Sequence, residues 1–247
     1  MVNRIAVYAE GPTEWYTVYQ LRKRGILAQA DMVGCGDRDQ VGRWIINRRK
    51  LKNIFANPKL PEYDGILFIL DQEDNESPFK AARDIADGFF ELSSLSGFDN
   101  IFTGQLSNRM NVAFHISSAP SPDGNRDFDG YLLKILDTCG DDAVNLWFEM
   151  EAHDYLKRHF SDSEIHSNQI RALGREEIPD LMERSHWDIL RNKTMLYAYI
   201  TALQADKSHV WFSEKVIKLA PPPILKDVFT NLIAAWYFLA GAENDEI

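Results

Sequence analysis

Cysteine is scarce in this sequence. Cys35 and Cys139 are the two cysteines among 247 residues, which excludes a disulfide framework and a zinc site built from cysteines. No apolar run reaches the roughly 20 residues that a membrane-spanning helix needs. The N-terminus enters a strand-like segment directly, without the pattern of a signal peptide. We therefore expect a soluble, cytoplasmic, globular protein with no membrane partner.

Several nucleotide and metal motifs are also missing. The chain has no Walker A sequence and no Gly-rich dinucleotide-binding motif, so it does not bind nucleotides through either of these motifs. Its six histidines show no H-E-x-x-H spacing, which excludes that kind of zinc site. The 45% share of hydrophobic residues is enough for a buried core and argues against a disordered chain.

Charge is distributed unevenly along the chain. The net charge is −10, yet residues 1–60 hold 11 Lys and Arg against 5 Asp and Glu. Part of this excess falls in a helix expected over residues 38–55. Its candidate contacts to a nucleic-acid backbone are Arg43, Arg48, Arg49 and Lys52. The alternative is a helix face that simply meets solvent.

Strand and helix patterns alternate in the first half of the chain. Continuous apolar runs at residues 5–9 and 65–70 are typical of central strands covered on both faces. The remaining expected strands lie within residues 27–33 and 111–116. The expected helices cover residues 12–24, 78–92, 128–138, 142–160, 177–204 with breaks, and 224–240. This order predicts an α/β fold with a mainly parallel sheet flanked by helices. We expect a catalytic domain over residues 1–138 and a helical extension over residues 139–247, packed on it as one compact unit.

Acidic residues follow two of the apolar strands. Glu10 ends the first strand, and Asp71 and Glu73 follow the central one. If these strands are neighbours, their carboxylates meet at one edge of the sheet, where ligands bind in open α/β folds. Glu14 lies one helical turn beyond Glu10. Crowded carboxylates favour a cation, and hard oxygen ligands favour Mg²⁺ or Mn²⁺. The alternative is that these acids are ordinary loop or capping residues.

The two acidic segments together resemble the Toprim domain, which primases, topoisomerases and OLD-type (overcoming-lysogenization-defect) nucleases share. That family has a Glu-Gly turn after its first strand, as in residues 10–14 here, and an Asp-x-Asp pair after a later strand. This chain has Glu73 at the second position of that pair, and Asp74 could substitute for it. The resemblance implies a Rossmann-like, mainly parallel sheet.

Two later segments are similar to the standalone and OLD-type branch of that family. Residues 127–133 resemble a Gly-x-Leu-Glu-Asp-like segment that opens a helix, with Asp129 at the usual Glu position. Lys193 matches a lysine in the helical region that follows. An ordinary exposed helix residue is the alternative for Lys193.

The resemblance implies metal-dependent hydrolysis of phosphodiesters in DNA or RNA, in phage defence or repair. It would assign one or two Mg²⁺ or Mn²⁺ ions to Glu10, Glu14, Asp71, Glu73 and Asp129. Glu10, Asp71, Glu73 and Lys193 would be the catalytic residues, with Lys193 placing positive charge on the phosphate. OLD-type nucleases work with an ATPase, and this sequence contains none, so the chain either works alone or has a separate ATPase subunit as a partner.

Two other functions stay open at this stage. In the first, the chain is a degenerate Toprim binding or regulatory subunit of a larger complex, and Glu73 marks decay of the metal site. In the second, it is a phosphotransfer enzyme or phosphatase with Asp71 as an aspartyl nucleophile. The sequence does not distinguish DNA from RNA or from a small phosphorylated substrate, and it does not indicate the oligomeric state.

Overall fold

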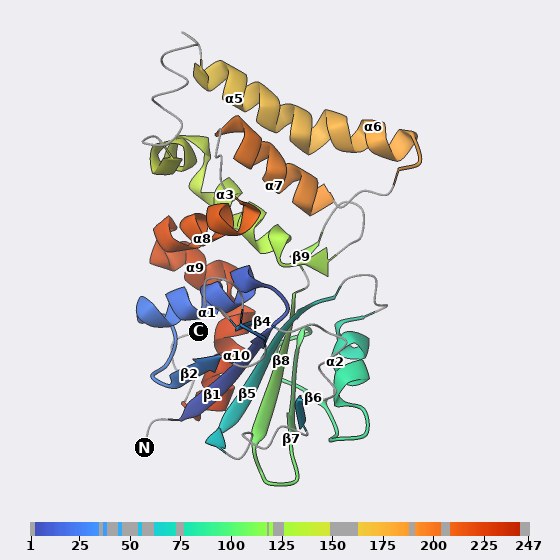
Figure 1. Ribbon diagram of the computed structural model, residues 1–247, viewed down its shortest axis with the longest axis vertical. Coiled ribbons are helices and arrows are strands. Elements are labelled where there is room, and N and C mark those ends of the chain that lie inside the picture. Colours follow the sequence, from blue (N-terminus) through green and yellow to red (C-terminus); the bar gives the residue numbers. More distant parts are fainter. Residues whose placement is uncertain are drawn as a thin grey trace. The chain divides into compact units, whose positions relative to one another are not determined.

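The computed structural model describes residues 3–34, 37–38, 44–45, 54–55, 62–72, 77–117, 119–120, 126–148, 163–187, 191–203 and 208–242. The chain forms two compact units (Figure 1). Unit 1 comprises residues 1–118 and 225–247, and unit 2 comprises residues 119–224. Each unit is described by itself. No helix in the described parts of the chain is long and apolar enough to cross a membrane.

Unit 1 is built around one sheet. Its strands are β1 (Arg4–Ala9), β2 (Asp31–Gly34), β3 (Asp37–Arg38), β4 (Trp44–Ile45), β5 (Gly65–Asp71), β6 (Ser93–Ser94), β7 (Ile101–Gln105) and β8 (Asn111–Ser117). They run in the order β3-β4-β1-β5-β8-β7-β6, and β2 also pairs with β1. The described α-helices of this unit are α1 (Pro12–Lys23), α2 (Pro78–Ala86), α10 (Thr230–Ala240) and the last four residues of α9 (Pro222–Val228). β2, β4 and β5 are parallel to β1, β8 is parallel to β5, and β7 is antiparallel to β8.

An aromatic row crosses the centre of the sheet. Tyr8, Phe68 and Phe114 are register partners on β1, β5 and β8. Their rings stack with centroid distances of 5.4 and 4.7 Å. The buried side of α2, which includes Ile85, belongs to the same hydrophobic cluster. This packing holds the two strands that carry the acidic residues in a defined register.

The helix α10 brings the end of the chain back to the sheet of unit 1. It packs against β5 and β8, and Trp236 on it is fully buried. The indole Nε1 of Trp236 donates a hydrogen bond to the carbonyl oxygen of Ala28 (2.9 Å). Asn3 Nδ2 donates to the carbonyl oxygens of Leu239 and Ala240 (3.2 and 3.1 Å). The first strand and the last helix are therefore joined directly.

A histidine lies inside the sheet of unit 1. His115 on β8 is 1% exposed, and alternation along the strand places it on the face opposite Phe114. Burial lowers the pKa of His115 from 6.5 to about 3, because the charged imidazolium loses its hydration. Above pH 6.5 the side chain is neutral in both the folded and the unfolded chain. Below that value the unfolded chain takes up a proton that the folded chain does not bind.

We therefore expect the free energy of unfolding to fall as the pH drops from 6.5 towards 3. The contribution of His115 approaches about 1.4 kcal/mol per pH unit. His115→Leu removes this contribution, so its urea midpoint should change less than that of the wild type between pH 6.5 and about pH 5. Equal changes in the two proteins would contradict the assignment.

Unit 2 is mainly helical. Its elements are β9 (Ala119–Pro120), β10 (Arg126–Asp127), α3 (Asp129–Cys139), a helix at residues 141–148, α5 (Ser163–Ala172), the π-helical turn η3 (Leu173–Glu177), α6 (Ile178–Arg184), α7 (Arg191–Ala202), α8 (His209–Leu219) and the first three residues of α9 (Pro222–Val228). α3 packs against α7 and α8, and α5 and η3 pack against α7. Phe148 and Phe212 stack in its core with a centroid distance of 4.8 Å.

The expected α/β fold with a mostly parallel sheet is confirmed, and two expectations about its parts differ from the structure. A helix over residues 38–55 is wrong where that segment is described, because Arg38 and Trp44 are partners in the antiparallel strands β3 and β4. The boundary between the two units falls after residue 118 instead of residue 138, and α10 returns to unit 1. The apolar face of the sheet needs a covering helix, and α10 supplies it from the far end of the sequence.

Candidate active site

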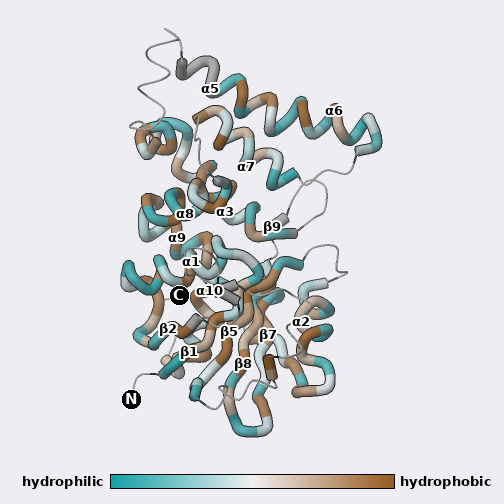
Figure 2. The backbone as a smooth tube through the Cα atoms, in the orientation of Figure 1, coloured by the Kyte–Doolittle hydropathy of each residue, from teal (hydrophilic) through white to brown (hydrophobic). Residues whose placement is uncertain are grey.

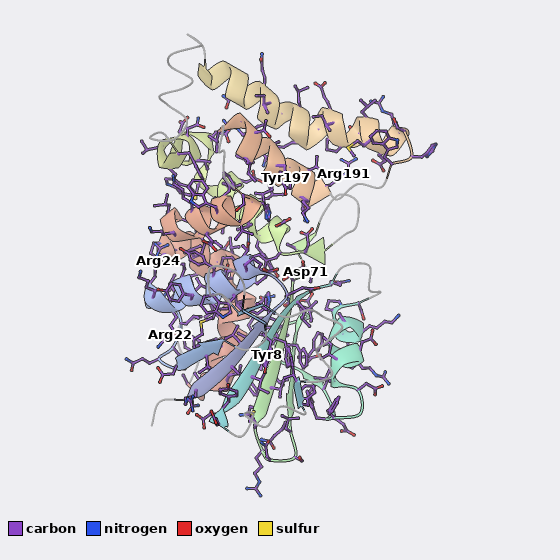
Figure 3. The ribbon with its side chains drawn as sticks, in the orientation of Figure 1. Tyr8, Arg22, Arg24, Asp71, Arg191 and Tyr197 are labelled. Atoms are coloured by element: carbon purple, nitrogen blue, oxygen red, sulfur yellow. The ribbon has the colours of Figure 1, made fainter. Side chains whose placement is uncertain are left out.

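Glu10 and Asp71 lie together at the carboxyl ends of β1 and β5. Figure 3 labels Asp71 at the end of its strand. The backbone N–H of Glu10 donates to the carbonyl oxygen of Ile69 (3.0 Å), which extends the pairing of the two strands by one residue. The backbone N–H of Asp71 donates to Oε2 of Glu10 (3.1 Å). This hydrogen bond holds the Glu10 carboxylate beside the backbone of Asp71. Both side chains are partly exposed, so they are accessible to a ligand.

Glu14 is held at the beginning of α1. Gly11 is the N-cap residue of this helix, and Glu14 is the third residue inside it. A Cβ at Gly11 would lie 2.6 Å from Oε2 of Glu14, so glycine leaves the space that this carboxylate occupies. Glu14 is 7% exposed. A carboxylate at a helix N-terminus interacts favourably with the helix dipole, which is a structural role in addition to the predicted metal-binding one.

Ser117 also lies at this candidate site, and no sequence motif predicted its position there. It is the register partner of Asp71, and its carbonyl oxygen accepts the backbone N–H of Gln72 (3.2 Å). The Ser117 side chain is buried, and its Oγ has no hydrogen-bond partner among the described residues. Its place beside Asp71 follows from the adjacency of β5 and β8, which no local motif indicates.

Several predicted site residues lie outside the described residues. These are Glu73, Arg43, Arg48, Arg49 and Lys52. In the described part of the chain, no three His, Cys, Asp or Glu side chains gather closely enough to hold a metal ion. The described acidic site therefore consists of the pair Glu10 and Asp71, with Glu14 at the adjoining helix start.

The other two predicted site residues belong to unit 2. Asp129 is the first residue of α3, and its Oδ1 lies 3.1 Å from Nε2 of His209 on α8. The His209 ring also stacks on Tyr197, with a centroid distance of 5.6 Å. Lys193 is exposed on α7. Metal binding by Asp129 and phosphate binding by Lys193 stay predictions.

Asp127 joins the starts of two helices in unit 2. Its Oδ1 accepts hydrogen bonds from the backbone N–H of Gly130 (3.1 Å) and from Nδ2 of Asn192 (2.9 Å). Asp127 and Asn192 are both buried, whereas Lys193, the next residue, is exposed. The acidic segment at residues 127–130 thus has a structural function that the sequence did not indicate, because Asn192 is 65 residues away.

Gly130 is needed where α3 begins. A Cβ at this position would lie 2.6 Å from the Cβ of Ala119 and 2.9 Å from Nδ2 of Asn192. We expect Gly130→Ala to lower the free energy of unfolding by about 1–3 kcal/mol, measured by urea denaturation. Because Ala119 supplies the nearest atom, the double variant Gly130→Ala/Ala119→Gly should recover part of the loss. A neutral single variant would contradict this account.

Comparison with known proteins adds evidence on the fold. No family model and no curated protein matches the sequence. The chain is similar to the crystal structure of a hypothetical protein from Pyrococcus horikoshii OT3, with a TM-score of 0.55 and 10% sequence identity. The match covers 96% of this chain and 99% of that one. At this identity the likeness shows the fold alone, and function has to be argued from the site.

Proposed function

We propose that this chain is a metal-dependent phosphodiester hydrolase that cleaves nucleic acid. The observation that carries the proposal is the pairing of Glu10 and Asp71 at the carboxyl ends of adjacent parallel strands, joined by a 3.1 Å hydrogen bond. This edge of an open α/β sheet is where ligands bind. The Toprim resemblance of the two strand ends supports the same activity.

The donor chemistry of Glu10 and Asp71 fits Mg²⁺ or Mn²⁺. Mg²⁺ binds through one or two carboxylates and keeps several waters, so a third protein ligand is not required. When bound, such a metal acts as a Lewis acid on a phosphoryl oxygen. The chain contributes the position of the Glu10 carboxylate, because the Asp71 N–H holds one of its oxygens. Ser117 and the start of α1 border this pair.

Nucleic acid is the proposed substrate, a separate ATPase subunit is a proposed partner, and the cytoplasm is the proposed location. The excess of basic residues in positions 1–60 supports a polyanionic substrate, because basic side chains attract phosphate groups. The rest of the chain is strongly acidic, so this attraction is confined to the first part of the sequence. The ATPase subunit is proposed from the resemblance to OLD-type systems alone.

The test is a cleavage assay on the full chain with Mn²⁺ or Mg²⁺. The substrates are supercoiled plasmid, single-stranded DNA, RNA and the small diester bis-p-nitrophenyl phosphate, with Asp71→Ala beside the wild type. We expect metal-dependent cleavage by the wild type and none by the variant. Equal cleavage by both proteins would reveal a contaminating nuclease, and it would contradict the proposal if it persisted after repurification.

A second candidate is a non-catalytic Toprim-like subunit. It is favoured by the finding that no group of three potential ligands occurs among the described residues. Titration of the chain with Mn²⁺, followed by electron paramagnetic resonance, separates the two functions. Binding that Asp71→Ala abolishes supports the hydrolase, whereas the absence of binding together with the absence of cleavage supports the non-catalytic subunit.

A further inference from the structure

Unit 2 carries one long helix with an unusual turn in its middle. α5, η3 and α6 run without interruption over residues 163–184 (Figure 1). The π-helical turn η3 crosses α7 at Gly174, where a Cβ would overlap the Cβ of Ala198. One side of the helix, which includes Arg171, Gly174 and Pro179, is therefore buried.

Beside the buried side lies a row of exposed apolar side chains, Ile170, Leu173, Ile178 and Leu181. We call these four residues the apolar stripe. Figure 2 shows hydrophobic residues among hydrophilic ones along α5 and α6. Residues three apart lie on one face of an α-helix, and residues five apart lie on one face of a π-helix. The turn η3, which begins at Leu173, therefore aligns Ile178 and Leu181 on α6 with Leu173 and with Ile170 on α5. Leu181 is 59% exposed.

Trp187, just beyond the end of α6, is a further exposed apolar residue of this segment. Its backbone N–H donates to the carbonyl oxygen of Met182 (3.0 Å), and the N–H of His186 donates to that of Glu183 (3.0 Å). His186 has a φ of 58°, which completes a helix-ending turn of the Schellman type. This turn fixes the backbone of Trp187, whose side chain is nonetheless 66% exposed. Exposed apolar patches of roughly 300–600 Å² on a monomer are often functional, typically as interaction sites.

Two charges of opposite sign flank the apolar stripe. Glu177 and Arg184 are both exposed, two helical turns apart. Among the residues that the structure describes, neither forms an ion pair. Arg184 Nε instead donates to the backbone carbonyl oxygen of Asp180 (3.2 Å). Asp180 and Glu183 differ from them, because both bind Arg191.

We propose that two copies of this chain associate through this helix, packed antiparallel about a twofold axis near Asp180 and Leu181. In that register Glu177 of each copy lies opposite Arg184 of the second copy. Leu181 is at the centre, and Trp187 of each copy reaches towards Leu173 of the other. A twofold axis satisfies both free charges at once with a single patch. A partner helix of one charge sign would leave either Glu177 or Arg184 unmatched, so these charges favour a second copy.

Sedimentation velocity of the full chain over a range of concentrations tests the proposal. We expect a dimer, and we expect Leu181→Asp to be monomeric at the same concentrations. Leu146, which is 66% exposed on the helix at residues 141–148, offers a matched control. Leu146→Asp should remain dimeric, and circular dichroism should show that both variants are folded.

Charge exchange tests the register. Glu177→Arg and Arg184→Glu should each weaken the dimer about tenfold, because each places two like pairs across the axis. The double variant should return to within about twofold of the wild type, because it restores opposite charges. A monomeric wild type at all concentrations, a dimer that survives Leu181→Asp, or equal weakening by Leu146→Asp would overturn the proposal. Single charge variants without effect would overturn the register.

Discussion

Glu10→Gln is expected to leave the chain folded and to reduce both Mn²⁺ affinity and cleavage about 100-fold, because changing even the residues that support a metal ligand costs about 10–100-fold. The amide oxygen of glutamine can still accept the hydrogen bond from the backbone N–H of Asp71, so the pairing of β1 and β5 persists. What disappears is the negative charge that a hard cation needs. Asp71→Asn should have the same effect for the same reason. Mn²⁺ titration and a cleavage time course measure the two losses separately.

The matched control for these two variants is Asp84→Asn. Asp84 is exposed in the second half of α2 and, among the described residues, forms no hydrogen bond or ion pair with Glu10 or Asp71, so its replacement removes the same charge from another part of the chain. We expect its Mn²⁺ affinity and cleavage rate to equal those of the wild type. If Glu10→Gln and Asp71→Asn also kept full Mn²⁺ affinity, the acidic pair would not be a metal site.

Trp236→Ala should lower the free energy of unfolding by about 3–5 kcal/mol. Trp236 is fully buried on α10, and its removal leaves a cavity between this helix and the sheet of unit 1. It also leaves the carbonyl oxygen of Ala28 without the indole donor. Urea denaturation followed by far-ultraviolet circular dichroism measures the loss. Trp236→Phe should lose less, because it keeps most of the packing.

Tyr237→Ala is the control on the same helix. Tyr237 is only partly buried, so its removal creates a smaller cavity, and we expect a loss well below that of Trp236→Ala. Similar losses for the two variants would mean that α10 packs less tightly on the sheet than its buried face indicates.

The central part of the fold could be predicted from local patterns. Residues 5–9 and 65–70 are continuously apolar, and the structure buries them as the adjacent parallel strands β1 and β5. The strand β7, which lies between β8 and β6, was not predicted. Its residues Ile101 and Phe102 are buried, but Thr103 to Gln105 are progressively exposed, which gives too short an apolar signal. The segment at residues 38–55 has many helix-forming residues, yet its residues 44–45 pair with β1, because an adjacent strand end overrides local propensity.

Only part of the candidate site could be predicted from the sequence. Glu10 and Asp71 each follow an apolar run, so their position at strand ends could be predicted one at a time. That their backbone and side-chain atoms meet depends on β1 and β5 being neighbours. The role of Asp127 depends in the same way on Asn192, which is remote in sequence. A pattern read along the chain does not contain such contacts.

The sequence by itself determined the alternation of strands and helices, the absence of a disulfide framework, and the acids placed directly after two buried strands. These features depend on neighbouring residues, whose hydrophobic periodicity and turn preferences act over a few positions. Only the tertiary structure decided that Glu10 meets Asp71, that α10 covers the first sheet, and that η3 aligns the apolar stripe on one face of its helix. The reason is that burying apolar surface selects partners by shape and area wherever they lie in the chain, and sequence distance does not enter that selection.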